Sequence, residues 1–268
     1  MKIDGKALAQ AILSDLTKQV AILKKKDITP TLVVILVGDN PESLSYIRQK
    51  QIATEKIGGR FIFEQLPKVT LPKELAARIA MYNRDSGVHG LIVQRPLPMH
   101  FDISINESIS PKKDIDGFVT NSPFDVPIAM AVFTILKQIG ITPQDKNVVI
   151  VGRGETAGKP IAEALAKQQC ATSIITSQTP NPNTIMKTAD IIISCVGKKG
   201  IVTRDALKAG VILMSVGLSR GEDNKLHGDY EEEDVKDIAS FYTPTPGGVG
   251  PLNIASLMQN LVKACTMK

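Results

Sequence analysis

The sequence contains little of what metal binding or disulfide cross-linking requires. Its three cysteines, Cys170, Cys195 and Cys265, include no Cys-x-x-Cys pair, and two of them lie in apolar runs, where a thiol behaves as a small hydrophobic residue. None of the three histidines stands at metal-ligand spacing from another histidine or from a cysteine. We therefore expect a protein of a reducing compartment with no metal site.

Long apolar runs and basic clusters are absent as well. No run approaches the roughly 18 apolar residues of a membrane-spanning helix, and the N-terminal residues mix charged with apolar side chains instead of forming a signal-peptide core. The 32 basic and 27 acidic residues give a net charge of only +5, and the lysines are spread along the chain. The sequence thus predicts a soluble, cytoplasmic protein that binds neither membranes nor nucleic acids.

What is present is material for two α/β domains. The 268 residues, 43% apolar and 22% charged, suffice for about two domains with apolar cores. Helical and strand patterns alternate, which predicts mostly parallel sheets with helices on their faces. We expect helices over residues 8–23, 43–57, 74–83, 129–139, 160–168, 184–188 and 252–264, and strands over 32–37, 61–66, 90–94, 147–151, 172–176, 191–196 and 211–216.

A glycine-rich turn joins one of these strands to the helix that follows. Gly152, Gly154 and Gly158 stand between them, an arrangement that brings a phosphate against free N–H groups at a helix N-terminus. The spacing is one residue longer than the usual dinucleotide fingerprint, so an ordinary strand-to-helix turn is the alternative. No acidic residue ends the next strand, whereas Arg153 and Ser177 could receive a 2′-phosphate, which favours NADP over NAD. A solvated Arg153 without a partner is the other possibility.

The first half of the chain carries a second group of polar candidates. Tyr46 and Lys50 are one helical turn apart, and a lysine beside an aromatic ring in a partly desolvated site can transfer protons, although surface pairs of this kind are common. Gln94 ends a buried strand, where open α/β sheets bind ligands. Asp114 and Asp116 share a turn, in which a plain turn or cap role is the alternative for either carboxylate.

Five segments of the chain, in order, form a recognisable set. They are Ser43-x-x-Tyr46-Ile47-x-x-Lys50, Gly90-x-x-Val93-Gln94-x-Pro96-Leu97-Pro98, Lys113-Asp114-Ile115-Asp116-Gly117-Phe118, Val151-Gly152-Arg153 to Gly158-x-Pro160, and Pro246-Gly247-Gly248-Val249-Gly250-Pro251. In register, this set resembles the bifunctional methylenetetrahydrofolate dehydrogenase/cyclohydrolase family, and the opening Ile3-Asp4-Gly5-Lys6 is similar too. The resemblance covers essentially the whole chain.

The resemblance implies a two-domain α/β enzyme with a cleft between its domains. It implies a folate-binding catalytic domain over residues 1–120 plus 250–268, a Rossmann-like NADP-binding domain over 121–249, a C-terminal helix that returns to the first domain, and a homodimer. The implied reactions are the NADP-dependent oxidation of 5,10-methylenetetrahydrofolate to the methenyl form and its hydrolysis to 10-formyltetrahydrofolate. The substrates would thus be tetrahydrofolate derivatives.

The resemblance also implies residue roles. Lys50 would be the catalytic lysine, Gln94 would position and tune it, and Tyr46 would stack on the folate. Asp116 would hydrogen-bond the pterin ring. The remaining implied contacts are Pro246, Gly247 and Gly248 for the folate, and Gly152, Arg153, Gly154, Gly158 and Ser177 for NADP.

The sequence departs from the family pattern mainly on the nucleotide side. The family has a longer stretch that contains a Pro-Cys-Thr-Pro element where this sequence has residues 121–127, which lack that element. In addition, Gly154 stands where many relatives have serine, Ser215 replaces an aspartate, and Asn253 replaces a threonine. This one-sided drift suggests, as an alternative, a cyclohydrolase with weak or lost dehydrogenase activity. Two further alternatives are a non-catalytic folate- or nucleotide-binding dimer and an unrelated two-domain oxidoreductase such as a shikimate dehydrogenase.

Overall fold

The chain divides into two units, each assembled from separate stretches of sequence. The computed structural model describes residues 1–267. Unit 1 consists of Met1–Ala9 and Ile128–Asn253, and unit 2 of Gln10–Pro127 and Ile254–Lys268. The divisions fall within helices α1 (Gly5–Lys24) and α8 (Val249–Ala264) and at the first residue of α4 (Pro127–Gln138).

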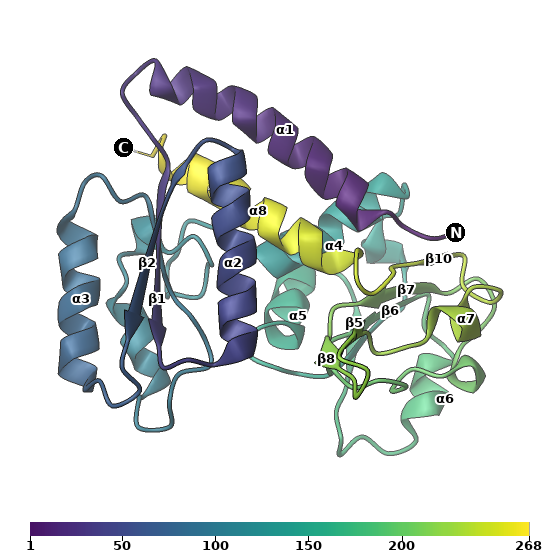
Figure 1. Ribbon diagram of the computed structural model, residues 1–268. Helices are drawn as coiled ribbons and strands as arrows, with labels where there is room; N and C mark the ends of the chain where they lie inside the picture. Colours follow the sequence, from purple (N-terminus) through teal and green to yellow (C-terminus); the bar gives the residue numbers. More distant parts are fainter. Residues whose placement is uncertain (268) are drawn as a thin grey trace. The chain divides into compact units, whose positions relative to one another are not determined.

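Unit 2 is built on a three-stranded parallel sheet. Strand β1 (Thr31–Val37) lies between β2 (Arg60–Leu66) and β3 (Gly90–Val93). All seven residues of β1 are buried, as expected for a continuous run of β-branched and aliphatic residues. Helices α2 (Pro41–Lys56) and α3 (Pro72–Arg84) lie on opposite sides of the sheet (Figure 1), because right-handed crossovers in opposite directions place their helices on opposite faces.

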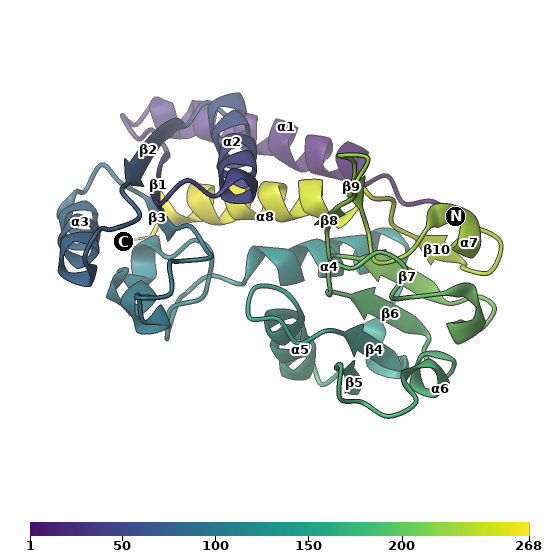
Figure 2. The same ribbon diagram turned by 60° about the horizontal axis from the view of Figure 1, so that its bottom comes forward.

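The sheet of unit 1 has five strands in the order β10-β7-β6-β4-β5, and the pairing is parallel throughout (Figure 2). The chain passes from β4 to β5 on one side and then returns to β6 on the other. At such a reversal of strand order, a crevice opens at the carboxyl ends of the strands. The strands are β4 (Val148–Val151), β5 (Thr172–Ile175), β6 (Ile191–Ser194), β7 (Ile212–Ser215) and β10 (Phe241–Tyr242), accompanied by helices α5 (Gly158–Lys167), α6 (Pro182–Met186) and α7 (Glu232–Val235).

Each unit has its own apolar core. In unit 2, β1 and β3 pack against α3, through residues that include Ile35, Leu75 and Ile79. In unit 1, the core contains residues of β4, β6 and β7, such as Val149, Ile192 and Leu213, together with buried residues of α6 and α7. No helix in the described part of the chain is long and apolar enough to span a membrane.

The expected elements are present, with shifted ends and several additions. Helix α8 begins at Val249, three positions before the expected start, and α5 begins at Gly158. Three strands were not expected from the sequence: the antiparallel pair β8 (Ser219–Arg220) and β9 (Leu226–His227), and β10. These strands have two residues each, too few for an alternating pattern. The short 3₁₀ helices are η1 (Ile103–Ser108), η2 (Pro111–Lys113), η3 (Pro143–Asp145) and η4 (Arg204–Ala206).

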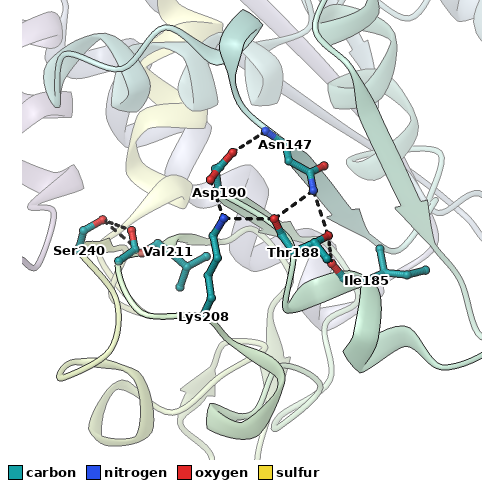
Figure 3. A network of polar contacts seen from close by, with 8 residues as sticks. Asn147, Ile185, Thr188, Asp190, Lys208, Val211 and Ser240 are labelled. Atoms are coloured by element: carbon teal, nitrogen blue, oxygen red, sulfur yellow. Dashed lines mark hydrogen bonds and ion pairs between the residues drawn. The ribbon is translucent and has the colours of Figure 1, made fainter.

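A polar network joins the amino ends of β4 and β6 in unit 1 (Figure 3). Asp190, just before β6, accepts a hydrogen bond from the backbone N–H of Asn147, just before β4, at 2.7 Å. Its other carboxylate oxygen pairs with Lys208 Nζ at 2.6 Å. The Asn147 side chain donates to the carbonyl oxygen and the hydroxyl of Thr188 at 3.1 and 3.0 Å. The bond from Lys208, followed by that from Asn147, lowers the pKa of Asp190.

Removing this network should cost little stability, and the cost should depend on pH. We expect Asp190→Ala to lower the free energy of unfolding by about 0.5–1.5 kcal/mol at pH 7, because the ion pair is partly exposed and screened. The pKa of Asp190 in the folded state lies below its ordinary value of 3.8. The stabilisation is therefore present above pH 3.8 and disappears as the pH falls through the lowered pKa. Urea unfolding at pH 7 and pH 3 tests this. Lys208→Met should reproduce most of the loss, and an Asp190→Ala variant as stable as the wild type at pH 7 would contradict it.

Candidate active site

Lys50 is a buried lysine on helix α2 of unit 2. Its exposed fraction is 8%, and Nζ donates to Gln94 Oε1 at 3.0 Å. The nearest acidic oxygen, Asp116 Oδ2, is 4.0 Å from Nζ. The helix starts locally, because Pro41 occupies its first turn and the Asn40 side chain accepts a hydrogen bond from Ser43 N–H. The surface-pair alternative for Tyr46 and Lys50 is therefore wrong for Lys50.

The Gln94 side chain is oriented by a carbonyl group. Its Nε2 donates to the Arg95 carbonyl oxygen at 2.9 Å, so the amide oxygen faces the lysine. The Ser43 hydroxyl reaches the same carbonyl at 3.4 Å. Gln94 directly follows β3, at the carboxyl end of the sheet, as the sequence predicted.

Tyr46 presents its ring to solvent, one helical turn before Lys50. The residue is 43% exposed, high for a tyrosine on a helix packed against a sheet. Partial burial, with a smaller contribution from the charge of Glu42, raises the pKa of its phenol. The group is thus a neutral aromatic surface, suited to stacking on a planar ligand.

Asp116 is held in a turn that is fixed from two sides. Asp114 is buried and accepts the Val119 N–H at 2.8 Å. From α8, the buried Asn260 donates from Nδ2 to the carbonyl oxygens of Ile115 and Asp125, both at 2.8 Å. The backbone around Asp116 is thus fixed, while its side chain keeps 25% exposure.

Three residues with positioning roles in unit 2 were not recognised from the sequence. Asp114 was treated only as a turn residue, and Ser43 only as part of a motif. Asn260 was not singled out at all. A buried asparagine on the apolar face of an amphipathic helix is a usable signal, because a buried amide requires partners.

Glycine is required at two positions in the turn of unit 1. Gly152 has φ +96°, and a Cβ on Gly158 would lie 2.0 Å from the Gly152 carbonyl oxygen. Helix α5 can therefore start directly against the turn, and no side chain caps its N-terminus. A Cβ on Gly154 would meet nothing within 4 Å, so that glycine is not required by packing.

Arg153 and Ser177 are both exposed in unit 1. Ser177 lies in a turn after β5, in which Thr176 N–H donates to Thr179 Oγ1 at 2.9 Å. Arg153 forms no ion pair with any acidic side chain among residues 1–267. The guanidinium is thus available to an anionic ligand.

The Pro246-Gly247-Gly248 loop, also in unit 1, packs on the start of the chain. Gly247 has φ +111°, and a Cβ on Gly5 would lie 1.9 Å from the Gly248 carbonyl oxygen. The loop leads directly into α8 at Val249. The candidates therefore form two groups, with Tyr46, Lys50, Gln94 and Asp116 in unit 2 and the others in unit 1.

Comparison with known proteins shows the family to which the chain belongs. Residues 3–116 match the family model "Tetrahydrofolate dehydrogenase/cyclohydrolase, catalytic domain", and residues 127–268 match the "NAD(P)-binding domain" of the same family. The chain belongs to the tetrahydrofolate dehydrogenase/cyclohydrolase family. Membership confirms the expected fold class and the expected dehydrogenase/cyclohydrolase, with the family's catalytic and NAD(P)-binding domains in one chain. It also confirms a nicotinamide dinucleotide cofactor, and the unrelated-oxidoreductase alternative is wrong.

Several relatives extend this family match over almost the full length. "Bifunctional protein FolD" of Lacticaseibacillus casei is 39% identical over 97% of this chain and 96% of its own. The crystal structure of the FolD methylenetetrahydrofolate dehydrogenase/cyclohydrolase from Campylobacter jejuni has TM-score 0.95 and 36% identity, covering 99% of this chain and 98% of that one. The Trypanosoma brucei enzyme, complexed with NADP cofactor and inhibitor, has TM-score 0.93 and 30% identity, covering 99% and 97%.

The carboxyl of Asp114 should give the protein a characteristic pH dependence of stability. Burial raises its pKa to about 6 from 3.8, so the folded state is increasingly disfavoured as the pH rises through this window. Asp114→Asn should therefore gain about 2–3 kcal/mol relative to the wild type between pH 4 and pH 8. Urea unfolding across this range measures the difference, with Asp145→Asn as an exposed control. A stability difference between the two proteins that does not vary with pH would contradict the raised pKa of Asp114.

Proposed function

We propose that the chain oxidises 5,10-methylenetetrahydrofolate with NADP and hydrolyses the methenyl product to 10-formyltetrahydrofolate, with Lys50 as the acid/base. The observation that carries this proposal is the buried Lys50. Its Nζ donates a hydrogen bond to Gln94 Oε1 at 3.0 Å and lies 4.0 Å from Asp116 Oδ2. A direct assay with 5,10-methylenetetrahydrofolate, run once with NADP and once with NAD, tests both half-reactions. No observation favours a cyclohydrolase without dehydrogenase activity or a non-catalytic binding dimer.

In the hydrolysis, Lys50 moves protons. Water adds to the methenyl carbon and loses a proton to Lys50 Nζ. The bond from that carbon to one ring nitrogen then breaks as Nζ returns this proton to the nitrogen. The hydroxyl group loses its remaining proton to water and becomes the formyl C=O, so the cation and one water give 10-formyltetrahydrofolate and one released proton. Gln94 holds Nζ in place through its amide oxygen, and burial limits competition from bulk water.

The same unit would hold the folate. Tyr46 would stack on its planar part, and the Asp116 carboxylate would accept hydrogen bonds from the N–H groups of the pterin edge. Supporting it, the Asp116 turn is rigid and its side chain remains partly exposed.

The residues present in unit 1 fit a dinucleotide. The close packing of Gly158 on Gly152 and the uncapped N-terminus of α5 suit a pyrophosphate, which would approach the turn formed by Gly152, Arg153 and Gly154. Arg153 and Ser177 would hold the 2′-phosphate of NADP. When bound, NADP accepts the hydride from the methylene carbon, and the chain supplies orientation.

The division of labour along the chain is also a proposal. Residues 1–120 plus 250–268 would form the folate-binding catalytic domain, and residues 121–249 the NADP-binding domain. The hydrogen bond from Asn260 to the Ile115 carbonyl oxygen supports the assignment of α8 to the catalytic domain. We further propose that the enzyme works in the cytoplasm without membrane or nucleic-acid partners, which the small net charge of +5 supports.

Lys50→Met should abolish methenyl hydrolysis while leaving the fold intact. Methionine keeps most of the apolar stem but cannot transfer protons, so the cyclohydrolase kcat should fall by about 10²-fold or more. Stopped-flow loss of methenyl absorbance measures it. Lys56→Met, on the same helix and exposed, is the matched control. Wild-type hydrolysis by Lys50→Met would rule out the proposed role.

Arg153→Ala should weaken the use of NADP but not of NAD. A guanidinium–phosphate contact is worth about 1.5–3 kcal/mol, and because Gly154 offers no hydroxyl we expect the lower end, roughly a tenfold rise in KM for NADP. Dehydrogenase rates at varied NADP and NAD concentrations measure the change, with Lys167→Ala on α5 as the control. If the wild type reduces NAD as fast as NADP when both are at low concentration, Arg153 does not recognise the 2′-phosphate.

We also propose that the enzyme is a homodimer joined through strand β2. This strand is an edge of its sheet, with unpaired backbone groups on one side, and Phe63 on it is 41% exposed. Sedimentation equilibrium should show a dimer for the wild type and a shift toward monomer for Phe63→Lys, whereas Ile22→Lys on α1 should remain dimeric. A monomeric wild type, or an unshifted Phe63→Lys, would contradict the proposal.

A further inference from the structure

Asp229 is a buried carboxylate of unit 1 that lies outside both groups of candidate residues. Its exposed fraction is 0%, and no cationic side chain among the described residues forms an ion pair with it. A buried, unpaired carboxylate is costly unless hydrogen bonds satisfy it. Three donors do so here, and two of them are backbone N–H groups of a single loop.

The loop held by Asp229 directly follows β6. Asp229 Oδ2 accepts the Val196 N–H at 3.0 Å, and Oδ1 accepts the Lys198 N–H at 2.8 Å. The third donor, the Ser194 hydroxyl, reaches Oδ2 at 2.7 Å from the last residue of β6. The carboxylate therefore fixes the path of residues 195–198, which stand at the carboxyl end of a central strand.

This loop also forms a wall of the glycine-rich turn. A Cβ on Gly152 would lie 3.1 Å from both the Cys195 carbonyl oxygen and the Val196 side chain. A Cβ on Gly217, after β7, would lie 2.2 Å from Gly197 N and 2.4 Å from Asp229 Oδ2. The ends of β4, β6 and β7 thus meet around Asp229, on the edge where parallel α/β sheets bind dinucleotides.

We propose that Asp229 is a positioning residue for the dehydrogenase half-reaction, which it serves by holding the loop 195–198 against the glycine-rich turn. The proposal rests on the proposed function, in which this edge binds NADP. Asp229 does not act in hydrolysis, because the proton-transferring Lys50 belongs to unit 2. Its loss should therefore separate the two activities of the chain.

Asp229→Asn is the decisive variant. Asparagine has nearly the same shape as aspartate, but its side chain has only one acceptor oxygen. The three donors around Asp229 use both carboxylate oxygens. If that oxygen keeps the bonds from Ser194 and Val196, the amide group opposes the Lys198 N–H, and the loop must shift. A misplaced loop should raise the KM for NADP about tenfold or more, while NADP-independent methenyl hydrolysis stays within about twofold of the wild type.

Two further variants distinguish positioning from a general structural role. Ser194→Ala removes the donor on β6 but leaves both loop bonds, so its KM for NADP should stay within about twofold of the wild type. Gly197→Ala strains the loop without touching Asp229, since this glycine has φ +71° and a Cβ would lie 2.8 Å from the Leu218 carbonyl oxygen. Gly197→Ala should therefore also raise the KM for NADP. If Asp229→Asn does not fold, this variant shows whether the position of the loop 195–198 controls NADP binding.

The measurements are steady-state KM and kcat for NADP, NADPH affinity by its own fluorescence, and methenyl hydrolysis without cofactor, on the full chain. Selective loss of NADP affinity in Asp229→Asn, with Ser194→Ala unaffected, is the expected result. Parallel loss of both activities, or an unchanged KM for NADP, would overturn the assignment of Asp229. A wild type without dehydrogenase activity would instead overturn the proposed function, so the two failures are distinguishable.

Discussion

The hydrogen bond between Lys50 Nζ and Gln94 Oε1 is the interaction on which the proposed chemistry depends. A lysine with 8% exposure needs a partner, because an ammonium group loses its hydration when it is buried. Here the closest partner is a neutral amide, and the nearest carboxylate oxygen is 4.0 Å away. The lysine is therefore fixed in place by a neutral amide, with the Asp116 carboxylate at the outer limit of an ion pair.

The surrounding structure of unit 2 serves this contact. The buried strand β1 leads through Asn40 into α2, which carries Lys50, and β3 ends at Gln94. Helix α8 holds the Asp116 turn through Asn260. Unit 1 follows the same principle, since its glycine-rich turn and the loop bound by Asp229 also stand at carboxyl ends of parallel strands.

The sequence predicts the regular elements and the chemically distinctive residues, because both leave local patterns. The buried run of β1 and the glycine turn after β4 could be placed from the sequence alone. The supporting contacts could not, since they join residues far apart in the chain. Asn260 reaches back 145 positions to Ile115, and Asp229 binds a loop about 30 positions earlier. The two-residue strands β8, β9 and β10 are too short to leave a periodic pattern.

The most direct test of this account is the pair of activities of Gln94→Met. Methionine has nearly the length of glutamine but cannot accept a strong hydrogen bond from Nζ, so the lysine loses its fixed position. We expect methenyl hydrolysis to fall at least about tenfold while the KM for NADP stays within about twofold of the wild type. Undiminished hydrolysis would show that Gln94 does not position the lysine.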